Sequence, residues 1–369
     1  MRGTIFLSAG EPSGDLHGSA LAREIRRRWP QARLVGLGGK GMAAEGVELL
    51  AGLSELAVMG FAEVVRHLPF LLRLQRRAVH SLRGADLFIP IDYPGLNLRL
   101  ARAARKRGVS VLYYIAPQVW AWHRSRAARL ARDTDLVACA LPFEEPFLRA
   151  AGVDARFVGH PLLDLASPAA SREEWCAENR LDPGRPLLAL LPGSRGQEVS
   201  RHLQLFTEAA KLLVNSGVQP VVASSPALGE AVYRGVEFPR VQGSRGLLAH
   251  ARAALVKSGT STLEAALAVV PMVVAYRMHP LSHALARRLV EVPHIALANL
   301  VAGDRVVPEL VQDEATPEAL AAALLPLLAE GSDTRQAQLN GLAGVRERLG
   351  GPGAAERVTE LAAELLAAR

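Results

Sequence analysis

Several short segments of this 369-residue chain place carboxylates, cations or hydroxyls beside glycine and proline, directly after an apolar run. In the segment 91–97 (IDYPGLN), a carboxylate precedes a proline-stiffened turn. A carboxylate held close to a hydroxyl nucleophile can remove its proton, which is typically worth about 10²- to 10⁴-fold in rate. Asp92 is therefore the predicted general base; alternatively, it caps the helix expected to begin near Leu96.

The segment 192–197 (PGSRGQ) has a composition suited to an anion. Gly193, Ser194 and Arg195 lie between an apolar run and an expected helix, so backbone N–H groups and one guanidinium can converge on a phosphate. The segment lacks the GK[ST] ending of a Walker loop. It predicts a phosphate contact of another kind, or else an ordinary helix start.

A second segment suited to an anion, 257–262 (KSGTST), precedes another expected helix. Ser258, Gly259 and Thr260 offer small hydroxyls and backbone N–H groups at that helix start. Glu264 is expected on the first turn, where its carboxylate could accept hydrogen bonds from a ribose. Two such segments in one domain favour a diphosphate ligand over two unrelated helix starts.

Near the N-terminus, the segment 8–15 (SAGEPSGD) brings Glu11, Ser13 and Asp15 to the end of an expected strand. Ser13 or Asp15 can cap the following helix, and a contact between these side chains and a substrate explains the segment equally well. The nearby segment 36–41 (GLGGKG) matches GxGxxG. It follows the second strand, however, and no acidic residue answers it about 20 positions later, so we interpret it as a glycine-rich turn.

The segment 117–126 (PQVWAWHRSR) holds two of the chain's four tryptophans. Gln118, Trp120 and His123 would suit a sugar or acyl-phosphate ligand, whereas tryptophan often serves to anchor a loop in the core. From the sequence both interpretations stay open.

The segment 61–77 carries an apolar face together with an arginine cluster. Such a helix can dip into lipid while its cations meet anionic headgroups, although a helix packed on a core has the same periodicity. The residues predicted to contact a membrane are Phe61, Val64, Val65, Leu68, Leu71 and Leu72.

For these segments to act together, several strands must end at the same edge of a sheet. Branched apolar runs alternate with amphipathic helical patterns, which is typical of β-α-β units. Strands are expected at 4–10, 33–39, 86–92, 109–116, 136–141 and 155–160, and again at 187–194, 220–225, 253–259 and 271–276. We predict an α/β fold of two Rossmann-like parallel-sheet domains that face a cleft lined by the loops at the strands' carboxyl ends.

Proline-rich and glycine-rich composition after residue 160 predicts the domain boundary. The first domain is expected to span 1–165 and the second 166–353. The helix expected at 354–369 could pack back on the first domain.

Composition narrows the class of protein. Half of the residues are hydrophobic and 21% are charged, as in a folded globular protein. No apolar run approaches the ~18 to 20 residues of a membrane-spanning helix, and no signal peptide is evident, so we expect a cytoplasmic location.

Two cysteines without a CxxC pattern predict neither a disulfide framework nor a zinc site. The net charge of +7 favours an anionic partner. Nucleic acid is not expected, because the aromatic residues are not spaced as a stacking platform.

Taken in order, nine sequence strings resemble those of lipid A disaccharide synthases over nearly the whole chain. They are GEPSGDLHG, ELAVMGFAEV, IDYPGLN, PQVWAWHRSR, LPFEEPF, FVGHPLLD, LLPGSRGQEV, KSGTSTLEA and PMVVAYR. The resemblance implies a B-type glycosyltransferase fold with an acceptor-side first domain and a UDP-sugar-binding second domain. It also implies transfer of 2,3-diacylglucosamine from UDP-2,3-diacylglucosamine to the 6-hydroxyl of 2,3-diacylglucosamine 1-phosphate, without cofactor or metal.

The resemblance implies roles for individual residues as well. An α-linked donor gives a β-linked product, so the reaction inverts and needs a base on the acceptor hydroxyl and stabilisation of the departing UDP. By resemblance Asp92 is the base, Arg195 contacts the diphosphate, and Glu264 contacts the ribose. Arg277 and Asn299 are further expected substrate contacts.

Acylated substrates would give the apolar and basic face at 61–77 a purpose. The resemblance accordingly implies an enzyme peripherally associated with the cytoplasmic face of the inner membrane. The alternative is another UDP-sugar glycosyltransferase, or a nucleotide-sugar epimerase, of the same fold.

Overall fold

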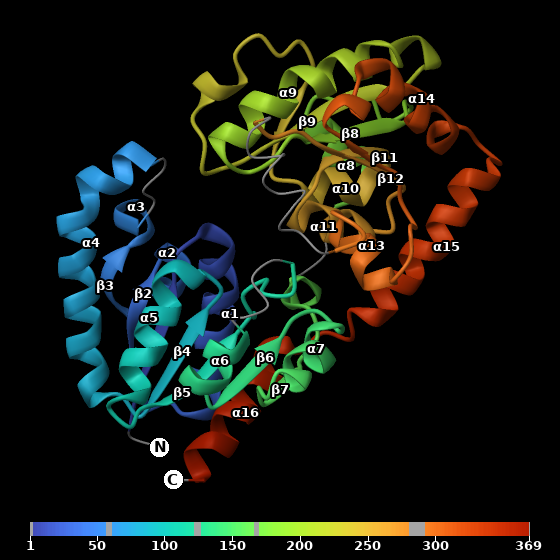
Figure 1. The fold of residues 1–369 in the computed structure, drawn as a ribbon. Helices are drawn as coiled ribbons and strands as arrows, with labels where there is room; N and C mark the ends of the chain where they lie inside the picture. The colour runs from blue at the N-terminus through green and yellow to red at the C-terminus, as the bar shows by residue number, and fades with distance from the viewer. Residues whose placement is uncertain (1–2, 57–60, 122–126, 166–169, 280–291, 369) are drawn as a thin grey trace. The chain divides into compact units, whose positions relative to one another are not determined.

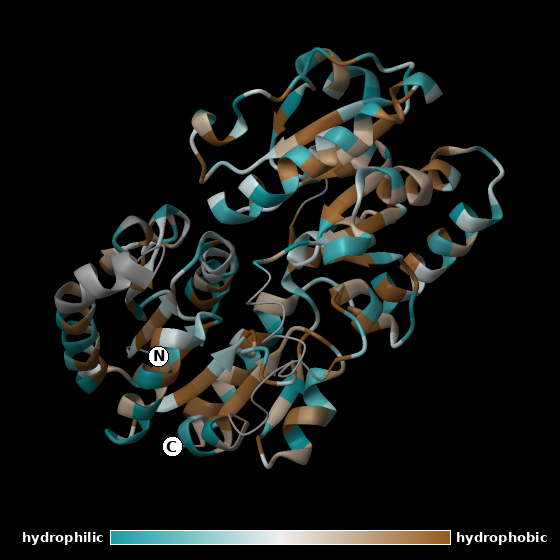
Figure 2. Ribbon diagram, turned by 45° about the horizontal axis from the view of Figure 1, so that its top comes forward, coloured by the Kyte–Doolittle hydropathy of each residue, from teal (hydrophilic) through white to brown (hydrophobic). Residues whose placement is uncertain are grey.

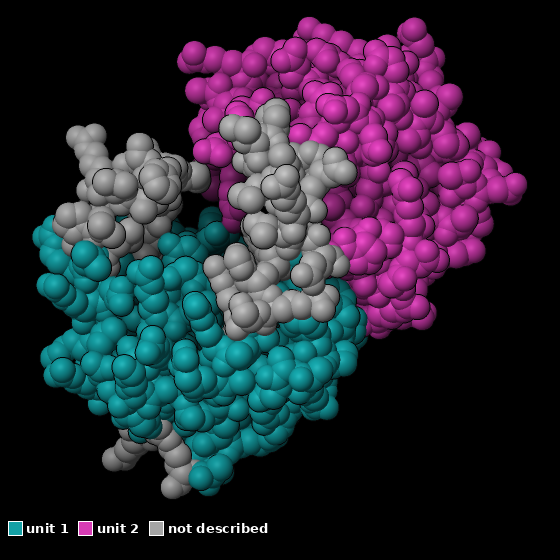
Figure 3. Space-filling view, viewed as in Figure 1, with its two compact units in different colours: residues 1–164, 350–369 teal, residues 165–349 magenta. Residues whose placement is uncertain are grey.

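A computed structural model describes residues 3–56, 61–121, 127–165, 170–279 and 292–368. The chain divides into two compact units (Figure 3). Unit 1 comprises Met1–Asp164 together with Gly350–Arg369, and unit 2 comprises Leu165–Leu349. Each unit is built on one parallel sheet with helices packed against it, which confirms the predicted fold class (Figure 1).

Unit 1 has a seven-stranded sheet in the order β3-β2-β1-β4-β5-β6-β7. The strands are β1 (Thr4–Ala9), β2 (Arg33–Gly38), β3 (Glu48–Gly52), β4 (Leu87–Ile91), β5 (Ser110–Tyr114), β6 (Leu136–Cys139) and β7 (Ala155–Phe157). All neighbouring pairs run parallel. The strand order reverses between β1 and β4, and ligands of open parallel sheets bind beyond the carboxyl ends of strands at such a point.

The helices of unit 1 cover both faces of its sheet. They are α1 (Pro12–Arg28), α2 (Lys40–Ala44), α3 (Leu53–Leu56), α4 (Phe61–Ser81), α5 (Pro94–Arg105), α6 (Ala127–Asp133), α7 (Glu144–Ala150) and α16 (Ala354–Ala367), with short 3-10 turns η1 (Leu82–Gly84) and η3 (Pro161–Asp164). Successive residues of β1 face opposite sides. Ile5 packs with Leu21 of α1, whereas Phe6 packs with Leu74 of α4 and Leu100 of α5. The strands are accordingly the most hydrophobic elements (Figure 2).

The sequence predicts six strands in unit 1, and the structure contains each of them. It also contains β3, which was not predicted. β3 lies at the sheet edge, and only Ala51 of its five residues is buried. A half-exposed edge strand lacks the continuous apolar run that marks a central parallel strand, so no such pattern predicts β3.

The last helix, α16, belongs to unit 1. Its Val358 and Leu361 are in the same core as β1 and α1. Two ion pairs join its surface to the unit, Arg27 with Glu356 at 2.9 Å and Arg156 with Glu364 at 2.6 Å. The carboxylate of Asp164 accepts hydrogen bonds from backbone N–H groups at the start of the helix.

Unit 2 has a six-stranded sheet in the order β10-β9-β8-β11-β12-β13. The strands are β8 (Leu187–Leu191), β9 (Gln219–Ser224), β10 (Arg240–Gln242), β11 (Ala251–Lys257), β12 (Met272–Tyr276) and β13 (Glu309–Val311). The helices are α8 (Arg172–Glu178), α9 (Gly196–Lys211), α10 (Arg245–His250), α11 (Thr260–Leu267), α13 (Leu297–Ala302), α14 (Pro317–Leu328) and α15 (Asp333–Arg348). The two strands that the sequence did not predict, β10 and β13, are three-residue edge strands.

Candidate active site

Asp92 follows β4 on an unusual turn. Asp92 and Tyr93 both have left-handed backbones, with φ of 46° and 49°, which is uncommon outside glycine and persists only where the surroundings impose it. The N–H of Asp92 donates to the carbonyl of Tyr114 at 3.1 Å, and its carbonyl accepts from the Tyr113 hydroxyl at 2.8 Å. These contacts fix the backbone of Asp92, a half-buried residue, at the carboxyl end of β4.

The alternative role for Asp92, as the cap of the following helix, is wrong. The N-cap of α5 is Tyr93, and the cap makes no side-chain hydrogen bond. The role of Asp92 as a base remains a prediction.

Asn97 supports this turn, and the sequence reading missed it. Its side chain is fully buried. The amide oxygen accepts from the Ser8 hydroxyl at 2.6 Å, and the amide nitrogen donates to the carbonyl of Asp92 at 2.8 Å. Asn97 thus ties the end of β1 to the end of β4. An asparagine that falls on the apolar face of the helix pattern at 96–107 was the available signal.

The expectation that Ser13 or Asp15 caps α1 is wrong. The N-cap of α1 is Glu11, again without a side-chain cap, and Ser13 is exposed within the first turn. The carboxylate of Asp15 instead accepts hydrogen bonds from the backbone N–H groups of Gly39, Gly41 and Met42, at 2.7 to 3.0 Å. Asp15 therefore caps α2, a structural role in place of the predicted substrate contact.

This cap also explains the GxGxxG match at 36–41. A Cβ at Gly39 would lie 2.5 Å from an oxygen of Asp15, so the glycine allows the carboxylate to approach. The N–H groups that a dinucleotide phosphate would need are bonded to a side chain of the chain itself. The predicted glycine-rich turn is reduced to Gly39, because residues 36–38 end β2 and α2 begins at Lys40.

The structure describes two of the three predicted contacts in the loop after β5, and one of these two is exposed. Gln118 is exposed, whereas Trp120 is only 7% exposed and its indole N–H donates to Glu144 at 3.0 Å. Of the two open interpretations of Trp120, the structure favours the anchor. His123 lies outside the described residues.

Two buried histidines lie near these loops, His17 on α1 and His160 after β7, each 6% exposed. Burial lowers the pKa of His17 to about 4, partly offset by Asp164. Burial and the neighbouring His17 lower the pKa of His160 to about 3. Both histidines are therefore neutral in the folded protein at mildly acidic pH, where histidines of the unfolded chain are protonated.

We expect this difference to destabilise the fold as the pH falls. Below the unfolded pKa of about 6.5, the unfolded chain binds protons that the folded chain does not, so each histidine costs about 1.4 kcal/mol per pH unit. Urea unfolding between pH 7 and 4.5 should show the loss, and the double variant His17→Gln, His160→Gln should show a flatter profile. His80→Gln, at an exposed position, is the control. An equally steep profile in the double variant would refute the assignment.

In unit 2, the loop after β8 forms the start of α9. Gly193 has φ 124°, and a Cβ there would lie 2.6 Å from the Cβ of Glu198, so only glycine fits. The carboxylate of Glu198 accepts hydrogen bonds from the N–H groups of Ser194 at 3.2 Å and Arg195 at 3.4 Å. The side chain of Arg195 is 56% exposed. The guanidinium is accessible, while an incoming phosphate would compete with Glu198 for these N–H groups.

Lys257 joins this loop to the one after β11, and the sequence reading did not assign it a role. Its ammonium lies 2.8 Å from Glu198 and 5.4 Å from the ring centre of Tyr276. Burial opposes ionisation of Glu198, but Lys257 holds the pKa of Glu198 below its ordinary value. The signal was present, since Lys257 is one of only four lysines in an arginine-rich chain and directly precedes Ser258.

The loop after β11 leads into α11. Gly259 is its N-cap, with φ 150°, and Thr260 is the exposed first residue of the helix. The hydroxyl of Ser258 donates to the carbonyl of Ile295 at 2.7 Å. Glu264 lies beyond the first turn, contrary to the expectation. Burial raises the pKa of Glu264, and the Ser244 hydroxyl donates to its carboxylate at 2.9 Å.

Arg277 and Asn299 have structural partners. The guanidinium of Arg277 donates to the carbonyl of Ala315 at 2.8 Å and also to that of Gln312. Asn299 is fully buried, and its amide makes four hydrogen bonds within unit 2, to Val306, Val307 and Glu309. The structure thus corrects the expectation for Asn299, whose side chain has no exposed surface for a substrate contact.

Helix α4 occupies nearly the predicted range. Its Leu74 and Ala78 are buried in the core of unit 1, whereas Leu72 is 44% exposed. The side chains of Phe61, Val64, Val65, Leu68 and Leu71 lie outside the described residues. Within the described ranges, no helix is long and apolar enough to cross a membrane.

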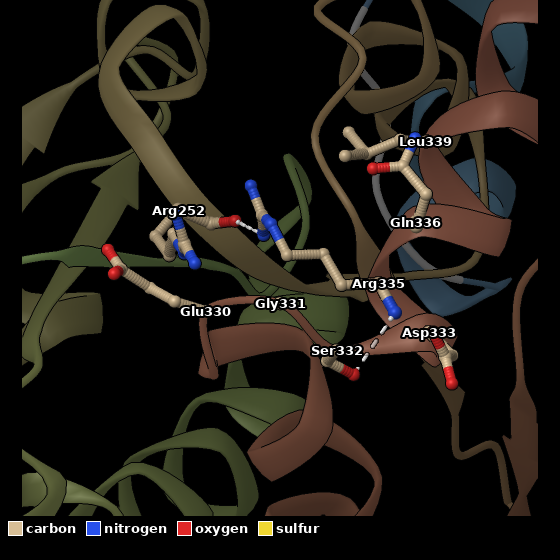
Figure 4. A pocket seen from close by; sticks show the side chains of 8 residues that line it. All are labelled: Arg252, Glu330, Gly331, Ser332, Asp333, Arg335, Gln336 and Leu339. Atoms are coloured by element: carbon tan, nitrogen blue, oxygen red, sulfur yellow. Dashed lines mark hydrogen bonds between the residues drawn. The ribbon is translucent and has the colours of Figure 1, made fainter.

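A cavity of about 400 Å³ lies away from these loops, at the opposite end of β11 (Figure 4). Its Arg335 donates to the carbonyls of Arg252 and Leu327, and Arg252 donates to those of Leu328 and Ala329. Both guanidinium groups therefore donate hydrogen bonds to backbone carbonyls at the C-terminal end of α14. Among the described residues, no three His, Cys, Asp or Glu side chains are grouped to hold a metal ion.

Comparison with known proteins agrees with this architecture. A calicheamicin glycosyltransferase structure aligns with 100% of this chain and 99% of its own at a TM-score of 0.61 and 19% identity. UDP-GlcNAc 2-epimerase from Neisseria meningitidis, bound to UDP-GlcNAc, aligns with 99% of this chain and 100% of its own at a TM-score of 0.61 and 9% identity. At such identities the likeness concerns the fold alone, which is that of B-type glycosyltransferases and related epimerases.

Sequence similarity is much more specific. Residues 5–350 match the family described as Lipid-A-disaccharide synthetase. The Lipid-A-disaccharide synthase of Acidobacterium capsulatum is 43% identical, with 99% of this chain and 97% of the relative aligned. That of Geobacter metallireducens is 42% identical, with 98% and 97% aligned. The chain therefore belongs to the lipid-A-disaccharide synthase family of glycosyltransferases.

Proposed function

We propose that the protein transfers 2,3-diacylglucosamine from UDP-2,3-diacylglucosamine to the 6-hydroxyl of 2,3-diacylglucosamine 1-phosphate. The products are a β-1′,6-linked disaccharide 1-phosphate and UDP. The observation that carries this proposal is family membership over residues 5–350. The geometry of the loops in each unit supports a division of labour in this reaction.

In unit 1, Asp92 is proposed to accept the proton of the acceptor hydroxyl. As this proton leaves, the oxygen forms a bond to the anomeric carbon of the donor on the face opposite UDP. A general base must be held close to the hydroxyl that it deprotonates. The left-handed turn, with its hydrogen bonds to Tyr113 and Tyr114, supplies that rigidity. Glu11, Ser13 and Gln118 are proposed acceptor contacts at the same strand edge.

In unit 2, the bond between the anomeric carbon and the diphosphate oxygen breaks, and UDP leaves with the electron pair. Arg195 and the backbone N–H groups at the starts of α9 and α11 are proposed to stabilise the negative charge that develops, without a metal. The Lys257 ammonium contacts Glu198 of α9 and lies close to Gly259, the N-cap of α11. Glu264 and Arg277 are proposed contacts to the nucleotide. The proposal requires that both units reach one donor–acceptor pair.

We also propose that the protein works at the cytoplasmic face of the inner membrane as a peripheral protein. Both proposed substrates carry fatty acyl chains, and α4 exposes Leu72 beside the exposed Arg73, Arg76 and Arg77. Apolar and cationic residues together favour anionic bilayers.

This membrane proposal predicts binding to vesicles that contain phosphatidylglycerol and weaker binding to vesicles of phosphatidylcholine alone. The triple variant R73E, R76E, R77E should lose most of the binding, because each cation near an anionic surface is worth about 1 kcal/mol. Co-sedimentation measures it. Equal binding of the variant and the wild type would contradict the assignment of this surface.

The reaction is tested by incubating the purified protein with both acylated substrates in detergent and EDTA, and identifying products by mass. The proposal predicts the disaccharide 1-phosphate and an equal amount of UDP. Donor and acceptor without acyl chains should react far more slowly. Activity that is indifferent to acylation would favour another UDP-sugar glycosyltransferase, and release of a 2-epimer from the donor alone would favour an epimerase. Loss of activity in EDTA would overturn the metal-free mechanism.

A further inference from the structure

Glu144 is a buried carboxyl that the proposed reaction does not use. It is the first residue of α7 and is 2% exposed. One oxygen accepts the indole N–H of Trp120 at 3.0 Å, and the other accepts the backbone N–H of Leu141 at 3.1 Å. Because a buried carboxyl is costly unless it is hydrogen-bonded, its presence indicates a constraint on geometry.

The partner of Glu144, Trp120, is held on a second side as well. Its ring packs edge-to-face on Phe143, with ring centres 4.9 Å apart. Trp120 and Val119 are buried, whereas Gln118 in the same loop is exposed. Contacts with Phe143 and Glu144 thus hold the Trp120 indole, and with it the loop 115–121, while Gln118 stays at the surface.

This loop adjoins the turn that carries Asp92. It follows directly from Tyr113 and Tyr114, which hydrogen-bond to the carbonyl and the N–H of Asp92. Burial raises the pKa of Glu144 to about 7, and the charge of Asp92 adds to the rise. Glu144 and Asp92 are therefore linked both through β5 and electrostatically.

We propose that Glu144 is a positioning residue for the acceptor side of the reaction: its carboxylate anchors the Trp120 indole and so holds the loop 115–121 in register with the Asp92 turn. The inference rests on the proposed function, because it takes Asp92 and Gln118 as acceptor-side residues. The carboxylate accepts at both oxygens, and protonation converts one of them into a donor. The anchor should consequently weaken when Glu144 is protonated.

Among the described residues near Glu144, few other groups can change charge at neutral pH. Burial raises the pKa of Cys139 on β6, and likewise that of Tyr113 on β5, so both stay neutral. Glu145 and Arg149, on α7 itself, form an ion pair at 2.9 Å. Within the described part of the chain, Asp92 is the remaining group whose charge raises the pKa of Glu144. A titration of this cluster near pH 7 thus reports Glu144, coupled to Asp92.

The anchor can be observed without activity. The chain has four tryptophans, so a spectrum of the ¹⁵N-labelled indole groups contains at most four signals, and the one lost in Trp120→Phe belongs to Trp120. We expect this signal to shift with pH in the wild type, with a midpoint near 7, and to stop shifting in Glu144→Gln. The Trp29 signal, from the end of α1, is the internal control. A Trp120 signal that does not move with pH would overturn the anchor.

Kinetics test the positioning role. In Glu144→Gln the side-chain amide has a single oxygen, so it can accept only one of the two hydrogen bonds. Trp120→Phe keeps an aromatic ring but removes the indole N–H. Each variant should lower kcat/KM for the acceptor about tenfold and leave UDP affinity unchanged. The double variant should be no worse than either single one, because both remove the same contact. The inflection near pH 7 in the wild-type kcat/KM profile should vanish in Glu144→Gln. Glu360→Gln, exposed on α16, is the matched control.

The outcomes separate this inference from the proposed function. Wild-type protein that makes no disaccharide refutes the proposed function, and the indole titration then still decides whether the anchor exists. If the wild type is active, either of two results overturns the positioning role. One is that the effects of the two substitutions add. The other is that the pH profile of Glu144→Gln is unchanged. If Glu144→Gln fails to fold, Trp120→Phe decides alone: it must lower kcat/KM for the acceptor without weakening UDP binding.

Discussion

Replacing Asp92 with asparagine should lower kcat by about 10²- to 10⁴-fold, while UDP affinity stays nearly unchanged. Asparagine has the shape of aspartate but cannot accept the proton of the acceptor hydroxyl. It is also among the residues that best tolerate a left-handed backbone, so the turn with φ 46° should survive the substitution. The chemical step is therefore the expected site of the loss.

Single-turnover rates and UDP titration calorimetry together measure this effect. The control is Asp154→Asn, at a carboxylate that is 55% exposed and belongs to the same unit. It should leave turnover unchanged. Near-normal turnover in Asp92→Asn would remove Asp92 from the role of base, and a parallel loss of UDP binding would indicate a structural defect.

Replacing Arg195 with alanine should lower kcat/KM for the donor by about 10²-fold or more, equivalent to about 3 kcal/mol for one preorganised donor to developing charge. The Arg195 side chain is 56% exposed, so the packing of the core should not depend on it. Lysine at this position keeps the charge but loses the forked geometry of the guanidinium. Arg195→Lys should therefore recover only part of the activity.

Steady-state kinetics with varied donor measure this loss, and UDP affinity measured by calorimetry should fall in parallel. Arg346→Ala, an exposed arginine on α15 of the same unit, is the control and should behave as wild type. Unchanged donor kinetics in Arg195→Ala would discredit the diphosphate contact and shift attention to Lys257, another cation at this edge.

Elements that are marked by a local sequence pattern could be predicted. Continuous apolar runs such as β1 and β8 marked the central strands, and their alternation with helices gave the parallel sheets. Glycine and proline after those runs located the loops at 91–97 and 192–197. The short edge strands β3, β10 and β13 gave no such run, because edge positions need not be apolar on both faces.

Contacts between distant segments could not be read from local patterns. Asp15 looked like a cap for its own helix, but it caps α2, more than twenty residues away. Asn299 looked like an available amide, but its oxygen accepts from Val306 and Val307, and its nitrogen donates to Val307 and to Glu309 on β13. Glu144 and Trp120 are separated by a whole β-strand, and only the fold brings them together. A polar residue's partner decides its role, and the partner is set by tertiary structure.

The anomeric configuration of the disaccharide tests the central claim most directly, because that claim is a single displacement in which Asp92 is the base and no covalent intermediate forms. The product made from the α-linked donor can be characterised by the proton coupling at the new anomeric centre. The account predicts a β-linkage and no covalent glycosyl-enzyme species in the mass spectrum of the protein during turnover. An α-linked product, or a glycosylated protein that forms and decays at the rate of turnover, would contradict it.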